Sequence, residues 1–128
     1  MDFDVIFYDD YKHIEVEIGG YTIRTDQPEA EGGTGVGPSP GKLLLAAVAS
    51  CTASTAYGYC SQHDLPLPTG MDVHVDSNDN IEKIHFEIHM PPDFPEDRVS
   101  AVRRAANTCW VKKQWLNPPG FETDIIRK

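Results

Sequence analysis

The feature that most limits how this chain can fold is an uncharged run from Leu43 to Gln62, LLLAAVASCTASTAYGYCSQ. A helix with so little charge must be buried in a protein core or in a membrane. The run is rich in Ala, Ser, Thr, Gly and Cys and holds few large aliphatic residues, which favours a soluble core. Ser39 and Pro40 suit the N-cap and the first helical position. The sequence therefore predicts a buried helix over about residues 40–62.

Alternating apolar and polar residues predict strands on both sides of this helix. The segments DVIFYDD and HIEVEIGGYTIRTD precede it, with turns expected at residues 9–10 and 19–20. The segment MDVHVDSNDNIEKIHFEIHM follows it as a hairpin that turns at residues 79–80. The Gly-rich loop over residues 27–38 is expected to be a flexible connection, since it lacks the ending of a phosphate-binding loop.

A second helix is expected from about Pro95 to Leu116, and FETDIIRK after it is expected to be a strand. The resulting order, βββ-α-ββ-α-β, is an α+β fold in which helices pack against antiparallel sheets. No repeat or linker divides the chain, so the 128 residues are expected to form a single domain, 1–128.

Charge and cysteine content limit the functional classes. A net charge of −9 argues against binding to nucleic acids or to anionic membranes, which need clustered Lys and Arg. The opening MDFDVIFYDD is acidic where a secretory signal is basic, and three cysteines are too few for a secreted disulfide scaffold. We therefore expect a cytoplasmic protein.

Each of the two expected helices carries a cysteine on a plausible buried face. Cys51 is surrounded by small residues that would let another helix approach, and Cys109 lies on the second helix. Cys60, nine residues after Cys51, points about 180° away on a straight helix and receives no role. From spacing alone, Cys51 and Cys109 are either a redox pair or two small buried apolar residues.

Other candidate sites are weaker. His85 and His89 have a zinc-like spacing, but on one strand they lie about 13 Å apart, so no metal site is predicted. Trp110, Trp115 and Tyr57 are either core or interface residues, or the lining of an apolar ligand pocket.

The segments GGTGVGPSPGKLLLAAVASC and CWVKKQWLNPPGFETDI together resemble the OsmC/Ohr family over essentially the whole chain. The resemblance implies an OsmC-like intertwined homodimer with two central helices per chain and active sites at the subunit interface. It further implies a thiol-dependent peroxidase for organic hydroperoxides, in which Cys51 is peroxidatic and Cys109 is resolving. No cofactor is implied; an external dithiol would reduce the disulfide.

The chain departs from the best-understood members of the family at two positions, and one of them is Trp110, which follows the second cysteine where they often have proline. Family members carry a glutamate ten residues before the peroxidatic cysteine, where it holds a catalytic arginine; here that position is Gly41. Arg24 is the candidate for that arginine, although it could also be a solvated strand residue. We therefore keep an alternative function, a non-catalytic small-molecule binder or redox-responsive dimer on the same fold.

Overall fold

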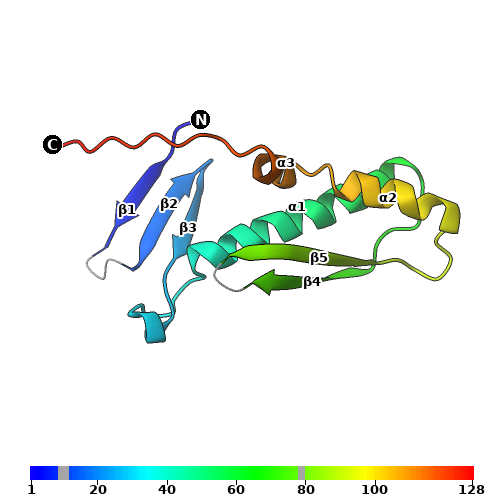
Figure 1. Ribbon diagram of the computed structural model, residues 1–128, viewed down its shortest axis with the longest axis horizontal. Coiled ribbons are helices and arrows are strands. Elements are labelled where there is room, and N and C mark those ends of the chain that lie inside the picture. Colours follow the sequence, from blue (N-terminus) through cyan, green and yellow to red (C-terminus); the bar gives the residue numbers. More distant parts are fainter. Residues whose placement is uncertain (9–11, 78–79) are drawn as a thin grey trace. The chain divides into compact units, whose positions relative to one another are not determined.

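A computed structural model describes residues 1–8, 12–77 and 80–128. The turns expected at residues 9–10 and 79–80 fall wholly or partly outside these described residues. By its internal contacts the chain divides into two units, Met1–Ala47 and Val48–Lys128 (Figure 1).

The N-terminal unit is built on an antiparallel three-stranded sheet in the order β1-β2-β3 (Figure 1). Its strands are β1 (Asp4–Phe7), β2 (Ile14–Ile18) and β3 (Tyr21–Thr25). Gly19 and Gly20 connect β2 to β3 with φ angles of +57° and +82°, which glycine adopts without steric cost. The expected hairpin at this position is confirmed.

The segment after β3 is more ordered than the sequence suggested. It contains a short 3-10 helix, η1 (Glu29–Glu31), and folds around the buried carboxylate of Asp26. Asp26 accepts hydrogen bonds from the Thr34 hydroxyl (2.6 Å), from Gln27 N (2.7 Å) and from Val36 N (3.3 Å). The prediction of a flexible connection missed this local network, because a loop without a recognised motif gives no sign that one carboxylate will organise it.

The long helix, α1 (Pro40–Gln62), begins and ends as predicted. The Ser39 hydroxyl accepts a hydrogen bond from Lys42 N at 3.3 Å, which confirms its role as the N-cap. Within the described part of the chain, α1 is the one helix long and apolar enough to cross a membrane. Core helices of soluble proteins pass the same test.

The C-terminal unit contains a second antiparallel pair, β4 (Gly70–Ser77) and β5 (Ile81–His89). Val73 lies opposite Phe86, so that the apolar residues of both strands share one face, as the alternation predicted. Ile88 of this face packs against a buried cluster from two helices, formed by Ala56, Cys60, Val102 and Ala106.

The expected second helix is wrong as a single element. The structure has η2 (Glu96–Arg98), α2 (Val99–Ala106) and then α3 (Trp110–Leu116). Asn107 ends α2, and the Thr108 hydroxyl donates to the Ala105 carbonyl oxygen at 2.7 Å. Asn and Thr are weak helix formers whose side chains compete for backbone hydrogen bonds, so the helix breaks there.

The expected C-terminal strand is not formed within this single chain. Residues 117–128 are described by the structure and adopt neither helix nor strand. A strand needs a neighbouring edge to satisfy its backbone groups, and Pro118 and Pro119 at the start of the segment remove two donors.

Candidate functional site

The site is built around Cys51, which lies half-buried in the middle of α1 within the C-terminal unit. Its pKa is lowered, first by the backbone N–H of Val111 and then by the thiol of Cys109 and the N–H of Trp110, while burial acts in the opposite direction. Trp110 and Val111 are the first two residues of α3, whose N–H groups have no acceptor inside their own helix. These free donors stabilise a thiolate.

Cys109 lies beside Cys51 because the helix break turns the chain there. Its backbone is extended (φ −61°, ψ 146°) and it forms the N-cap of α3, with Sγ accepting from Lys112 N at 3.4 Å. Thr52, the next residue after Cys51, places its hydroxyl 3.9 Å from Cys109 Sγ. The structure therefore brings Cys51 and Cys109 together, with both thiols free.

The sequence predicted Cys109 inside a continuous helix. It did not predict that a break in this helix makes Cys109 the N-cap of α3. An N-cap side chain faces the first N–H groups of its helix, whereas a mid-helix side chain cannot. The signal was the pair Asn107-Thr108, which favours a cap over a helix interior.

Lys112 is the functional candidate that the sequence did not suggest. Its ammonium group donates to Ala106 O (3.3 Å) and Asn107 Oδ1 (3.2 Å) and lies 4.2 Å from the centre of the Phe86 ring. Burial lowers the pKa of Lys112, whereas the charges of Cys109 and Cys51 act to raise it. If the helix break is known, a lysine three residues after Cys109 is the sequence signal for a cation near the thiols.

Cys60 lies apart from this arrangement. It is fully buried in the cluster with Ala56, Val102 and Ala106, and burial raises the pKa of its thiol. A buried thiol with a raised pKa is a poor nucleophile.

Arg24 belongs to the N-terminal unit. It lies on β3 opposite Glu15 of β2, and its guanidinium binds the Glu15 carboxylate at 3.0 Å. The Tyr8 hydroxyl donates to the same carboxylate at 2.7 Å. Arg24 therefore has an acidic partner on the neighbouring strand. The Arg24 side chain remains half-exposed, at 52%.

Two cavities in the C-terminal unit are lined in part by Lys112, whose backbone contacts Cys109. One, of about 370 Å³, is lined by Thr52, Phe86 and Lys112 together with apolar residues of β5 and α2. The other, of about 460 Å³, shares Phe86 and Lys112 and adds Trp115 and Leu116. Of the three aromatic residues considered above, Trp115 lines this cavity, Tyr57 lines a smaller one, and Trp110 is 70% exposed.

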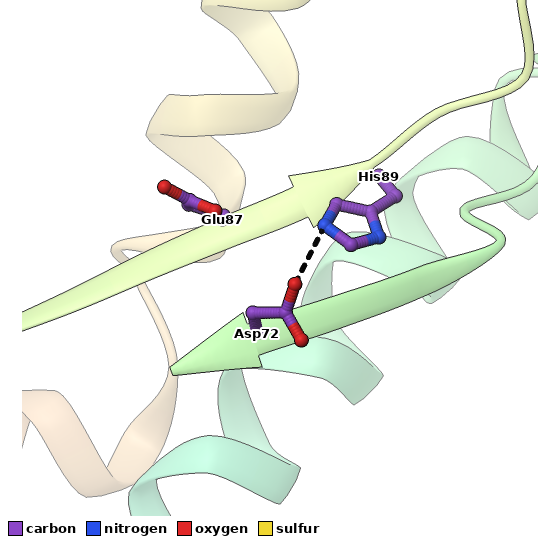
Figure 2. A group of neighbouring side chains, drawn as sticks. All are labelled: Asp72, Glu87 and His89. Atoms are coloured by element: carbon purple, nitrogen blue, oxygen red, sulfur yellow. Dashed lines mark ion pairs between the residues drawn. The ribbon is translucent and has the colours of Figure 1, made fainter. Parts of the chain in front are cut away.

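The distance of about 13 Å expected between His85 and His89 refers to residues of one strand, but the paired strand β4 brings further side chains close to His89. Strand pairing places Asp72 of β4 opposite Glu87, and His89 approaches Asp72 at 3.2 Å (Figure 2). Ligand atoms of Asp72, Glu87 and His89 lie within 4.8 Å of one another, but all three side chains are exposed. Exposed groups of this kind form ion pairs without a metal, so they receive no role here.

The chain is similar to known proteins in sequence and in fold. A family model described as OsmC-like protein matches residues 32–124. A crystal structure of an osmotic stress and detoxification response protein from Psychrobacter arcticus is similar with a TM-score of 0.70 and 21% identity, over 89% of this chain and 87% of that one.

Two further solved structures are similar. An OsmC-like protein from Mycoplasma pneumoniae has a TM-score of 0.63 and 17% identity, over 91% of this chain and 87% of that one. An organic hydroperoxide resistance protein OsmC from Legionella pneumophila has a TM-score of 0.57 and 18% identity, over 88% of each chain. At these identities the likeness concerns the fold. No curated protein matches the sequence.

Proposed function

Since this chain belongs to the OsmC-like protein family, we propose that it is a thiol-dependent peroxidase that reduces organic hydroperoxides through Cys51 and Cys109. The observation that carries the proposal is the pairing of a thiol of lowered pKa with a second free thiol at its side. The similar Legionella protein, an organic hydroperoxide resistance protein, supports the same chemistry.

The first step needs a thiolate and a peroxide. The Cys51 thiolate attacks the distal oxygen of ROOH, the O–O bond breaks, and the alkoxide takes up a proton to leave as ROH. Cys51 becomes a sulfenic acid. The N–H groups of Val111 and Trp110 support this step because they hold the sulfur in its charged, nucleophilic form.

The second step consumes the sulfenic acid before it can oxidise further. The thiol of Cys109 attacks the Cys51 sulfur and an S–S bond forms. The S–O bond of the sulfenic acid breaks, and its hydroxyl leaves as water after taking up the thiol proton. An external dithiol then reduces the disulfide by exchange. The sum is ROOH plus a dithiol giving ROH, water and a disulfide.

The cavities favour an organic substrate over hydrogen peroxide. Their walls include Ile84, Phe86, Trp115 and Leu116, which would bury the apolar part of a hydroperoxide. From the family we carry over Arg24 as a candidate cation at the site, and a homodimer in the cytoplasm as the assembly and its location.

Three single-cysteine substitutions test the proposal by hydroperoxide consumption with a dithiol reductant. Cys51→Ser should reduce turnover to the uncatalysed background, because a serine hydroxyl is a far poorer nucleophile at neutral pH. Cys109→Ser should still react once but should then accumulate sulfinic acid on Cys51, seen by mass spectrometry. Cys60→Ser is the matched control and should retain turnover. Equal activity in wild type and Cys51→Ser would end the catalytic proposal.

Two observations favour a second function. Gly41 stands where family members carry the glutamate, and the larger cavity is wide enough for a small apolar ligand. A non-catalytic binder or redox-responsive dimer would bind apolar molecules and form the disulfide without consuming hydroperoxide catalytically.

A further inference from the structure

We propose that Lys112 supplies the positive charge that favours the thiolate form of Cys51. The inference rests on the proposed function for its catalytic consequence, but the ionisation of the thiols can be measured without any peroxide. It assigns to α3 an electrostatic role that the sequence pattern and the family resemblance do not contain.

The first argument is the position of Lys112 in the chain. The break at residues 107–109 makes Cys109 the N-cap of α3 and Lys112 the third residue of that helix. Lys112 N donates to Cys109 Sγ at 3.4 Å, so its backbone is tied to one of the two thiols. A different helix boundary would remove this contact.

The second argument is where the ammonium group goes. It does not extend into solvent but turns back to the end of α2, where it donates to Ala106 O and Asn107 Oδ1. The Phe86 ring supports it from one side, at 4.2 Å from the ring centre. Two hydrogen-bond acceptors and an aromatic face restrict the position of this flexible side chain.

The third argument is that this charge is not already neutralised. Both acceptors are uncharged, and among the residues that the structure describes Lys112 forms no ion pair with a carboxylate. A half-buried cation without a counter-ion favours the anionic form of a neighbouring acid. The opposing influence of both cysteines on the pKa of Lys112 is the reciprocal of the same attraction.

Other charged groups along the cavities are less well placed. Arg103 and His85 line the first cavity, and Glu82 and Lys83 line the second, but all four side chains are exposed. Lys112 is half-buried and lines both cavities. Solvent screens exposed charges, so the half-buried lysine exerts the larger effect.

The test is the pH dependence of Cys51 alkylation by iodoacetamide in the full-length reduced protein, read at each cysteine by mass spectrometry. Lys112→Gln retains hydrogen-bond donors toward Ala106 and Asn107 but removes the charge. We expect the alkylation midpoint of Cys51 to rise by about one pH unit, the usual size of such a charge effect. Lys112→Arg should restore most of the wild-type midpoint.

The matched control is Lys113→Gln, an exposed lysine on the next position of the same helix, which should leave the midpoint unchanged. Ultraviolet absorbance of the thiolate checks ionisation, and circular dichroism checks folding. If Lys112→Gln does not fold, Lys112→Met takes its place. An unchanged alkylation midpoint of Cys51 in folded Lys112→Gln overturns the inference. A midpoint that shifts in Arg24→Gln but not in Lys112→Gln overturns it as well. A shifted midpoint without hydroperoxide consumption would uphold the inference and reject the peroxidase.

Discussion

A thiol in the middle of an apolar helix gains reactivity from what approaches it. Cys51 and Cys60 belong to the same helix, yet burial raises the pKa of Cys60, whereas N–H donors at the start of another helix lower that of Cys51. Burial alone disfavours a thiolate, so the difference comes from hydrogen-bond donors. Helical spacing and the family resemblance singled out Cys51, but they did not show which donors lower its pKa.

Asp26 shows the same principle with a carboxylate. Hydrogen bonds from the Thr34 hydroxyl and from the backbone of Gln27, Val36 and Thr34 lower its pKa from 3.8 to about 2, against the effect of burial. These donors favour the charged form in the folded state. The sequence indicated a Gly-rich loop, but not that one carboxylate would organise it.

We predict that Asp26 stabilises the fold at neutral pH and loses this effect in acid. Because the folded pKa is depressed, the contribution is complete above the ordinary carboxyl pKa and disappears as the pH falls from about 4 to about 2. Urea unfolding at several pH values should show Asp26→Asn less stable than wild type at pH 7, with the gap closing toward pH 2. Glu29→Gln, an exposed neighbour, is the control; a pH-independent gap would contradict the prediction.

At the scale of elements, helix α1 and both hairpins followed from local sequence, whereas the second helix and the final strand did not. Ser39 and Pro40 fixed the start of α1, and alternation fixed the face of β4 and β5. The break before Cys109 was missed because apolar spacing continues across it. The strand expected after Pro119 was wrong for a single chain because a strand needs a partner that local sequence does not name.

The loop that precedes α1 allows a matched pair of glycine substitutions. A Cβ on Gly33 would run into the Gln27 carbonyl oxygen and would approach Asp26 Oδ1 at 2.7 Å, whereas a Cβ on Gly41 would meet nothing within 4 Å. We expect Gly33→Ala to lower the free energy of unfolding by about 1–3 kcal/mol through overpacking. Gly41→Ala should raise it by up to about 1 kcal/mol, since alanine favours a helix. Urea denaturation compares the two; equal effects would contradict this reading of the loop.

At the scale of the whole molecule, apolar surface remains uncovered in the single chain. Along α1 the buried residues form one stripe at four-residue spacing, Val48, Thr52, Ala56 and Cys60. Tyr57 on another side of the helix is 49% exposed, and Ile125 in the unpaired C-terminal segment is 89% exposed. A chain of this length cannot cover such a helix on all sides by itself. A second copy of the chain would supply both a cover for the helix and an edge for the C-terminal segment.

We therefore predict a homodimer at micromolar concentration, measured by sedimentation equilibrium. Tyr57→Lys should weaken it by roughly thirtyfold in Kd, the effect of losing an interface aromatic worth about 2 kcal/mol. Ser100→Lys places the same charge at an exposed position of α2, outside helix α1, and should leave the Kd near the wild-type value. A stable, folded monomer of the wild-type protein at micromolar concentration would refute the prediction, and the exposed side of α1 would then need another explanation.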